Sequence, residues 1–209
     1  MSQPAVIRVL IVDDHAIVQQ GIAAIIQQES DMTVVGRAKD GIEAIALFRQ
    51  EQPDVTLMDL RMPQMGGVEA ITAICAEYNT ARVIVLTTYD GDEDIYQGLR
   101  AGAKGYLLKD SKPSELRTAI RTVHKGHQYI PPDVAAKLVQ RMSNPELSDR
   151  ELEVLQLVAK GMSNLEIGAA LNITESTVKS NVNRILSKLG VKDRTQATII
   201  ALKRGLTSL

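Results

Sequence analysis

Short apolar runs recur along the first 125 residues of the chain. Four of them are rich in β-branched residues and a fifth is weaker; in order, they cover residues 7–12, 33–36, 55–58, 83–86 and 105–108. Near-continuous apolar runs are typical of strands that are covered on both faces, as in a parallel sheet. The pattern therefore predicts five buried strands.

Stretches with helical spacing separate these runs. Ile17, Ile22, Ile25 and Ile26 form the apolar set of a first helix. Four more helices are predicted over residues 41–51, 68–77, 92–101 and 114–125. Strands that alternate with helices in this way predict a doubly wound α/β domain over residues 1–125.

The strand signals stop after His127. Glycine and proline punctuate the next segment, so residues 126–146 are predicted to be a linker that carries one helix over residues 133–142. Residues 147–209 are predicted to form an all-α domain of four helices. Three of these begin with a capping pair and the fourth has Thr174 as its expected cap; the pairs are Ser148 with Glu151, Ser163 with Glu166, and Asp193 with Gln196.

Composition restricts the classes of function that fit the chain. Its 209 residues suit two modest domains. A single cysteine, Cys75, allows no internal disulfide and favours a reducing, cytoplasmic setting. With only three histidines beside it, a zinc finger of Cys and His ligands is excluded. No signal peptide is recognisable and no apolar run approaches the roughly 20 residues of a membrane span, so we expect a soluble, intracellular protein with no membrane partner.

Charge differs between the two halves of the chain. The whole chain has a net charge of −1, residues 1–126 have a net charge of −4, and residues 145–209 have a net charge of +2. A surplus of this size is a weak electrostatic signal for DNA. All the aromatic residues precede residue 130, which excludes an aromatic stacking platform for single-stranded nucleic acid in the second half.

Polar side chains follow four of the predicted strands, where the functional groups of an open parallel sheet gather. They are Asp13, Asp14, Asp59, Thr87, Thr88 and Lys109. Three carboxylates at one edge repel one another unless a cation is present, and their oxygens suit Mg²⁺. A lysine and a threonine hydroxyl beside them make a site for a phosphoryl group on a carboxylate. An isolated Asp-Asp pair after a strand is usually a solvated turn, and an isolated lysine there is usually a surface residue. Only the combination of these residues at the ends of four strands points to a functional site.

Five segments resemble a known family. VDDH at residues 12–15, MDLRMP at 58–63, GG at 66–67, LTT at 86–88 and LK at 108–109 closely resemble the receiver domain of two-component response regulators. The resemblance covers residues 7–125 and implies a flavodoxin-like (βα)5 fold. It also implies that Asp59 is the phosphoacceptor and takes its phosphate from a sensor histidine kinase. Such a domain is not an enzyme beyond its own phosphorylation and slow autodephosphorylation.

The resemblance also implies the metal ligands. Asp14 and Asp59 would bind Mg²⁺ directly, together with the backbone carbonyl of Arg61, and Asp13 would act largely through water. The Arg61 side chain has two interpretations: it gates water at the acceptor, or it is a plain surface charge.

The remaining receiver residues are implied in the same way. Lys109 would pair with the phosphate, Thr87 would hydrogen-bond it when the domain switches, and Thr88 stands beside that hydroxyl. Tyr106 would be the aromatic residue of the switch. A cis peptide bond would precede Pro113.

The third predicted helix of the second half, residues 175–189, has two contrasting faces. One face is apolar and comprises Val178, Val182, Ile185, Leu186 and Leu189. The other has no acidic group and no large apolar side chain; it comprises Ser176, Ser180, Asn183, Arg184 and Ser187, with Lys179 at its border. Such a face suits phosphates and base edges in a major groove. With residues 164–171 and the turn at 172–174 it predicts a helix-turn-helix.

Four segments of the second half resemble the LuxR-type helix-turn-helix. They are LSDRELEVL at residues 147–155, KGMSNLEI at 160–167, TVK at 177–179 and LSKL at 186–189. With the receiver in front, the chain resembles a NarL/FixJ-subfamily response regulator. The resemblance implies base contacts from Lys179, Ser180 and Asn183. It implies phosphate contacts from Ser176, Thr177, Arg184, Lys188 and Thr195.

The last predicted helix is the dimerisation helix in that family. Its apolar residues are Ile199, Ile200, Leu202 and Leu206. The alternative interpretation is that these side chains close the core of their own domain.

Together these features predict a transcription factor that phosphorylation switches. A kinase phosphorylates Asp59, the receiver rearranges, and a homodimer binds a two-fold operator in double-stranded DNA. The main alternative is a phosphotransfer or protein-binding regulator whose helical half contacts a protein; steep salt dependence of duplex binding would favour the first. A haloacid-dehalogenase-like phosphatase is rejected, because the second aspartate of its motif would stand where this chain has Arg61 or His15.

Overall fold

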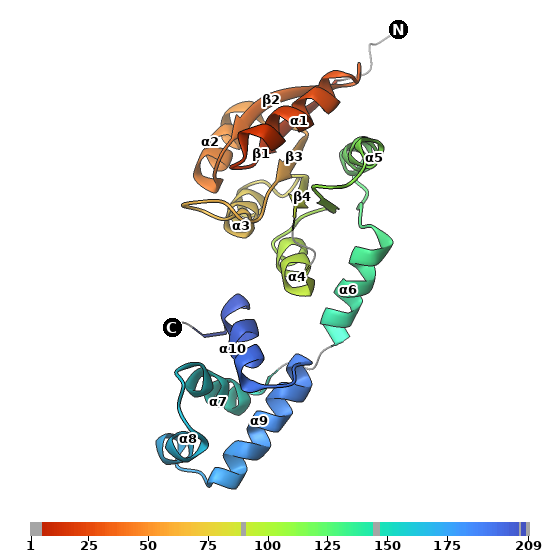
Figure 1. Cartoon of the computed structure of the whole chain (residues 1–209). Helices are drawn as coiled ribbons and strands as arrows, with labels where there is room; N and C mark the ends of the chain where they lie inside the picture. The colour runs from red at the N-terminus through yellow and green to blue at the C-terminus, as the bar shows by residue number, and fades with distance from the viewer. Residues whose placement is uncertain (1–5, 89–90, 144–146, 205, 208–209) are drawn as a thin grey trace. The chain divides into compact units, whose positions relative to one another are not determined.

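The computed structural model describes residues 6–88, 91–143, 147–204 and 206–207. The chain divides into two compact units, residues 1–138 and residues 139–209, and each is described by itself (Figure 1). Within the described ranges, no helix combines the length and the apolar character needed to cross a membrane.

The first unit contains a five-stranded parallel sheet with the order β2-β1-β3-β4-β5. Its strands are β1 (Ile7–Val12), β2 (Met32–Ala38), β3 (Val55–Met58), β4 (Val83–Thr87) and β5 (Gly105–Leu108). The helices between them are α1 (Ala16–Gln27), α2 (Gly41–Glu51), α3 (Gly67–Glu77), α4 (Asp92–Arg100) and α5 (Pro113–His124). The predicted doubly wound α/β fold is confirmed. The direction in which successive strands are added reverses between β1 and β3. Open parallel sheets bind their ligands at such a switch point.

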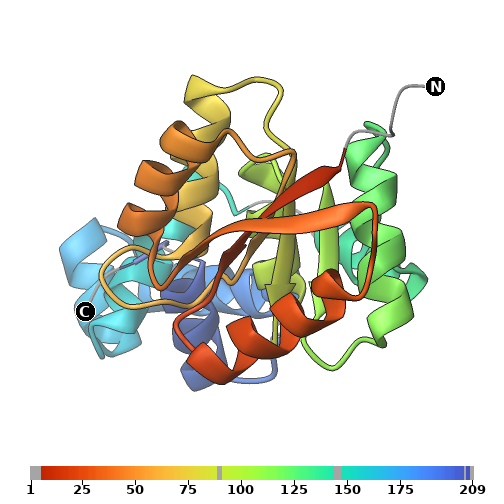
Figure 2. The same ribbon diagram turned by 90° about the horizontal axis from the view of Figure 1, so that it is seen from above.

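Helices cover both faces of this sheet, α2 and α3 on one side and α1 and α5 on the other (Figure 2), and an apolar core lies on each face. Met58 of β3 packs with Phe48 of α2 and Ile74 of α3 in one core. The neighbouring Leu57 packs with Ile26 of α1 and Ile120 of α5 in the other. Successive side chains of a strand point to opposite faces, so both faces of β3 are buried. This explains why the strands are nearly continuous apolar runs in the sequence.

The structure differs from the sequence predictions in local detail. Strand β2 extends to Ala38, beyond the predicted end at residue 36, and its register with β1 shifts between Val9 and Leu10, as at a β-bulge. Ile17, predicted as part of the apolar set of the first helix, is 85% exposed.

The cis peptide bond expected before Pro113 is a further error. No described peptide bond is cis, so the Lys112–Pro113 bond is trans. Pro113 opens α5 after an extended Lys112, a position that suits the fixed φ of a trans proline.

The segment after α5, up to residue 138, packs within the first unit. The Tyr129 carbonyl accepts a hydrogen bond from the Tyr106 backbone N–H, and a bridge joins Tyr129 to Gly105 beside β5. The next helix, α6 (Pro132–Ser143), places Val134 in the core on the α2–α4 side of the sheet. The linker boundaries at residues 126 and 146 remain a proposal, and residues 144–146 lie outside the described part.

The second unit contains the four predicted helices. They are α7 (Asp149–Ala159), α8 (Asn164–Leu171), α9 (Glu175–Leu189) and α10 (Arg194–Lys203). Each begins with the predicted cap: a side-chain oxygen of Ser148, Ser163, Thr174 or Asp193 accepts a backbone N–H three residues later. Their shared core includes Val154, Ile167, Val178 and Ile185. The all-α prediction is therefore confirmed.

Candidate functional site

Strand ends bring the predicted acidic residues and Lys109 to one edge of the sheet. The Asp13 N–H donates to the Ala38 carbonyl, the Asp59 N–H to the Val12 carbonyl, and the Lys109 N–H to the Thr87 carbonyl. These backbone hydrogen bonds hold each residue directly beyond its strand. The structure therefore brings together the carboxylates and the lysine that the sequence predicted at this edge.

Lys109 joins two buried carboxylates. Its Nζ lies 2.7 Å from Asp13 Oδ2 and 2.6 Å from Asp59 Oδ2. Asp13 and Asp59 are 1% and 4% exposed. Two carboxylates this far from water need a positive charge beside them, and Lys109 supplies it.

The pKa of Lys109 follows from this geometry. Burial lowers the pKa of the ammonium, but the hydrogen bonds to Asp13 and Asp59 outweigh it and raise the pKa above its ordinary value. Lys109 is therefore a fixed cation over the whole physiological pH range. A fixed cation next to a carboxylate can also hold an anion that forms on that carboxylate.

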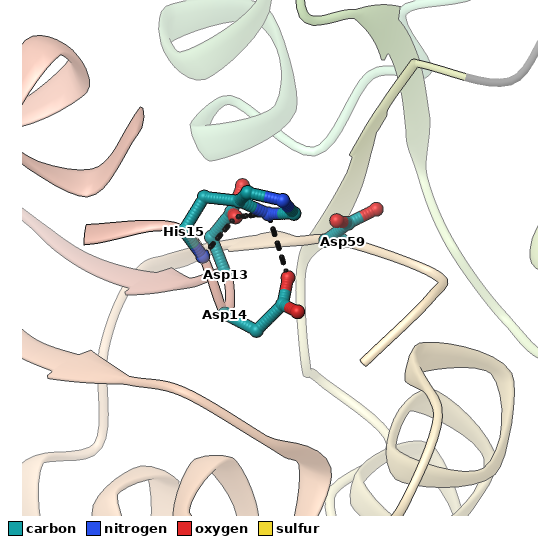
Figure 3. Close-up of side chains that lie close together, drawn as sticks. All are labelled: Asp13, Asp14, His15 and Asp59. Atoms are coloured by element: carbon teal, nitrogen blue, oxygen red, sulfur yellow. Dashed lines mark hydrogen bonds and ion pairs between the residues drawn. The ribbon is translucent and has the colours of Figure 1, made fainter. Parts of the chain in front are cut away.

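Asp14 and His15 complete the cluster (Figure 3). His15 Nδ1 lies 2.8 Å from Asp14 Oδ1 and 3.2 Å from Asp13 Oδ1. One potential ligand atom from each of Asp13, Asp14, His15 and Asp59 falls within 4.8 Å of all the others. Carboxylate oxygens at this spacing are the donor set that Mg²⁺ prefers, so the residues fit that ion. His15 was quoted in the sequence motif, but no role was predicted for its ring.

The second oxygen of Asp59 faces the start of the next loop. The Leu60 N–H donates to Asp59 Oδ1 over 2.7 Å. This loop passes close to α3, and a Cβ at Gly67 would lie 2.0 Å from the Asp59 carbonyl oxygen. Only a glycine at position 67 allows the loop to pack in this way. The structure therefore explains the second glycine of the Gly66–Gly67 pair in the sequence motif.

The Arg61 side chain points to α4. Its Nη2 lies 3.3 Å from Asp94 Oδ2, and both side chains are partly exposed. Exposed ion pairs of this kind add little stability. The Arg61 backbone N–H lies 3.5 Å from Asp59 Oδ1, so the Arg61 backbone is next to that carboxylate, and its carbonyl as a metal ligand stays a prediction.

The predicted switch residues differ in burial. Thr87 ends β4 and is fully buried, while Thr88, the next residue, is exposed. Tyr106 of β5 is fully buried and packs in the core on the α2–α4 face. A rearrangement of Tyr106 would therefore disturb the packing of that face.

Helix α9 presents the predicted polar face to solvent. Lys179, Ser180 and Asn183 are exposed, and Val178 and Ile185 on the other face are buried. The remaining predicted phosphate contacts Ser176, Thr177, Arg184 and Thr195 are also exposed. The amphipathic pattern of this helix is thus confirmed, whereas its contacts with DNA stay a prediction.

Lys188 has a partner inside the domain. Its Nζ lies 2.7 Å from Glu151 Oε2, and the Glu151 side chain is 5% exposed. The same oxygen accepts the Ser148 backbone N–H at the start of α7. Lys188 therefore joins α9 to α7 as well as being a candidate phosphate contact. The sequence assigned Glu151 only to the capping box and missed this ion pair.

The candidate dimer residues divide into two groups, and Leu206 among them lies after the end of α10 at Lys203. Ile200 and Leu206 pack against the core of the second unit, as the alternative interpretation expects. Ile199 is 48% exposed, and Leu202 is half-buried. Ile199 is the residue of this set most available to a second copy of the chain.

Comparisons with known proteins match both units. A family model of the response regulator receiver domain matches residues 9–121. A model of the bacterial regulatory proteins of the luxR family matches residues 145–201. The transcriptional regulatory protein LiaR of Bacillus subtilis (strain 168) is 43% identical over 210 residues, which are 97% of this chain and 100% of LiaR. The response regulator VraR of Staphylococcus aureus (strain NCTC 8325 / PS 47) is 42% identical, over 96% of this chain and 98% of VraR.

Solved structures of response regulators are also similar to this chain over most of its length. RcsB of Salmonella typhimurium is similar with a TM-score of 0.84 and 29% identity, over 93% of this chain and 98% of the RcsB chain. A structure of two RcsB dimers bound to two parallel DNAs gives a TM-score of 0.79 and 30% identity, over 95% of this chain and 98% of that chain.

Proposed function

The chain belongs to the two-component response regulators of the NarL/LuxR family, and from that premise we propose that Asp59 is its phosphoacceptor. As a member it is a regulator of transcription and not a classical enzyme. The observation that supports the acceptor assignment is the Lys109 ammonium between Asp13 and Asp59 at the carboxyl edge of the sheet. One carboxylate there must carry the phosphoryl group, and Asp59 stands at the end of the central strand β3, beside the loop to α3.

We propose that the residues around Asp59 divide the work of phosphoryl transfer. Asp14, Asp59 and the Arg61 carbonyl would hold Mg²⁺, with Asp13 acting through water, and the ion would neutralise charge on the transferred group. Lys109 would hold the phosphate by its charge, Thr87 would donate a hydrogen bond to it, and Thr88 and Tyr106 would take part in the switch.

The acceptor assignment is tested by a small phosphodonor. The wild-type chain should incorporate phosphate from acetyl phosphate in the presence of Mg²⁺, and Asp59→Asn should not, because an amide forms no acyl phosphate. Asp110→Asn is the matched control, since Asp110 is an exposed aspartate next to Lys109 and should leave incorporation unchanged. The measurement is mass spectrometry of the intact chain followed by mapping of the modified peptide. Phosphate on another residue of the wild type would overturn the assignment.

We further propose that a sensor histidine kinase is the phosphodonor and that phosphorylation raises self-association. RcsB, a structural relative, was solved as dimers on DNA, and Ile199 and Leu202 of this chain remain accessible on α10. Sedimentation over a range of concentrations should show a larger mass after phosphorylation. An unchanged mass would contradict the coupling. We propose that this regulation takes place in the cytoplasm, where its DNA target would be found.

We propose that α9 reads double-stranded DNA in the major groove through Lys179, Ser180 and Asn183. The exposed N-terminal half of this helix supports the proposal, because a recognition helix enters the groove by that half. Ser176, Thr177, Arg184, Lys188 and Thr195 would contact phosphates.

Base reading and phosphate anchoring should separate in two variants. Asn183→Ala should cost about 1–3 kcal/mol on the preferred operator and relax preference at one position, because an asparagine bonds adenine in two places. Arg184→Ala should weaken binding to every duplex about equally. The slope of log affinity against log salt concentration should become smaller in magnitude by roughly one. Both side chains are exposed, so neither change should disturb the core. The measurement is binding to a selected operator, its single-base variants and random duplex at several salt concentrations. An equal loss on all sequences for Asn183→Ala would show that this side chain does not read a base.

A further inference from the structure

Gln19, in the first turn of α1, holds together the ends of two strands. Its side-chain nitrogen Nε2 donates to the Asp13 carbonyl over 2.7 Å and to the Ala38 carbonyl over 2.8 Å. Asp13 directly follows β1, and Ala38 is the last residue of β2, the strand that pairs with β1. One amide group therefore connects a helix to the carboxyl ends of two neighbouring strands.

These hydrogen bonds use the whole donor capacity of the Gln19 amide. A side-chain NH2 group has two hydrogens, and each partner here is a different backbone carbonyl. Both partners are acceptors, so the nitrogen of the amide must face them and the oxygen must point away. The Ala38 carbonyl also accepts the Asp13 backbone N–H over 3.0 Å. A movement of any one of these three residues would therefore break a hydrogen bond to another.

The polar groups of Asp13 are held in place on all sides. Its backbone N–H and carbonyl bond to Ala38 and Gln19. Its carboxylate oxygen Oδ1 accepts the His15 backbone N–H over 2.9 Å, and Oδ2 lies 2.7 Å from Lys109 Nζ. Only 1% of Asp13 is exposed, so water has almost no access to it. The Asp13 backbone is thus a fixed starting point for the residue that follows.

Asp14 depends on Gln19 on both sides. It lies between Asp13 and His15 in the turn from β1 to α1, and 30% of its side chain is exposed (Figure 3). The Gln19 side chain holds the Asp13 carbonyl before it, and the Gln19 backbone N–H donates to the His15 carbonyl after it over 3.1 Å. Because an exposed carboxylate is not enclosed by packing, its place is decided by the backbone that carries it. Gln19 therefore sets where the Asp14 oxygens can lie.

We propose that Gln19 is a positioning residue for the Mg²⁺ site and sets its affinity for the ion through the backbone of Asp13 and Asp14. The inference rests on the Mg²⁺ site proposed above. Mg²⁺ demands near-ideal octahedral geometry, so it tolerates little displacement of a ligand. Water could satisfy the same carbonyls, but a water molecule is not attached to α1 and could not fix the strand ends relative to that helix.

The proposal is tested by titration of the full chain with Mg²⁺. Gln19→Met keeps the length of the side chain and removes the donor, so the dissociation constant for Mg²⁺ should rise by about tenfold or more, as is typical when a group that orients metal ligands is lost. Gln20→Met is the matched control, since Gln20 is the exposed neighbour in the same helix, and should leave the constant unchanged. Amide chemical shifts in NMR spectra measure the binding and show that each variant is folded.

A second variant separates position from charge. In Gln19→Glu the side chain keeps its size, but an ionised carboxylate cannot donate to the two carbonyls. Its negative charge alone would attract Mg²⁺, whereas the lost position should weaken binding. We expect weaker binding than in the wild type for Gln19→Glu, and no weakening for Gln20→Glu, which adds the same charge one residue later. Equal or tighter binding in Gln19→Glu would overturn the proposal.

The dependence of phosphorylation on Mg²⁺ distinguishes positioning from a purely structural role. With acetyl phosphate as donor, Gln19→Met should need about tenfold more Mg²⁺ for its half-maximal rate and should approach the wild-type rate at saturating Mg²⁺. A lower melting temperature with unchanged Mg²⁺ binding, or an equal loss of rate at every Mg²⁺ concentration, would show that Gln19 only supports the fold. A wild-type chain that binds no Mg²⁺ would instead defeat the proposed metal site, and this inference with it.

Discussion

Replacement of Gly67 by alanine is expected to destabilise the first unit by about 3 kcal/mol or more. Gly67 is the buried first residue of α3, and a Cβ there would lie 2.0 Å from the Asp59 carbonyl oxygen. A backbone atom cannot rotate away from this overlap, so either α3 or the segment after Asp59 must move. Such a movement would also break the hydrogen bond from the Gly67 N–H to the Leu60 carbonyl.

The same substitution at Gly21 is a matched control with the opposite sign. Gly21 lies in α1, is exposed, and a Cβ added there meets nothing within 4 Å. Alanine should therefore stabilise the helix by about 0.5–1 kcal/mol, because glycine loses more backbone freedom on folding. Urea unfolding followed by circular dichroism measures both effects. Phosphate incorporation at Asp59 should also slow in Gly67→Ala and not in Gly21→Ala; similar stability of the two variants would contradict the close packing.

Much of the fold could be predicted from the sequence because its signals are local. β3 is buried on both faces, so its four residues form a nearly continuous apolar run in which only Thr56 is polar. The helix starts of the second unit are likewise visible as Ser148 and Ser163 with a glutamate three residues later. Strand β2 was underestimated because its last residues, Arg37 and Ala38, are polar or small and are held by pairing with Ile11 and Val12 of β1, which sequence spacing does not reveal.

The site was predictable to the same degree and for the same reason. The topology of a parallel sheet brings Asp13, Asp59 and Lys109 to one edge, so the sequence positions after the strands were sufficient. Contacts that depend on side-chain direction were not predictable, such as the ring of His15 against Asp13 and Asp14. The pairing of Lys188 with Glu151 joins two helices that are far apart in sequence, and only the packing of α7 on α9 creates it.

Loss of the Lys188–Glu151 ion pair should strongly destabilise the second unit. Lys188→Met is expected to lower its free energy of unfolding by about 2–4 kcal/mol at neutral pH. Breaking a fully buried pair costs about 3–5 kcal/mol by leaving a charge uncompensated. The expected loss is somewhat smaller because the Lys188 side chain is 26% exposed and water can approach the pair. Exposed Lys192→Met in the same unit is the control and should stay within about 0.5 kcal/mol.

The pH dependence of the wild type follows from the pKa of Glu151. Burial raises the pKa of this carboxyl, but the hydrogen bond from Lys188 and those from Ser148 outweigh it, so the folded pKa lies below the ordinary value. The ionised pair therefore contributes stability above the unfolded pKa of about 4.3, and this contribution is lost as the pH falls through the lower folded value. In Lys188→Met the burial remains without the cation, so the pKa of Glu151 should rise. Protonation of Glu151 at acid pH then removes the uncompensated charge, and the difference in stability between this variant and the wild type should shrink as the pH falls.

A double variant separates the two roles of Lys188. Glu151→Gln combined with Lys188→Met removes both charges, and an amide oxygen at position 151 can still accept the Ser148 N–H. The double variant should recover most of the lost stability, because no buried charge is left without a partner. If Lys188 also contacts a DNA phosphate, the double variant should still bind every duplex more weakly, even with its stability restored. The slope of log affinity against log salt concentration should then be smaller in magnitude by roughly one. Urea unfolding and duplex binding on the same preparations measure the two quantities. Failure of the double variant to regain stability would show that the ion pair is not the reason for the loss, and an unchanged salt slope would remove Lys188 from the DNA interface.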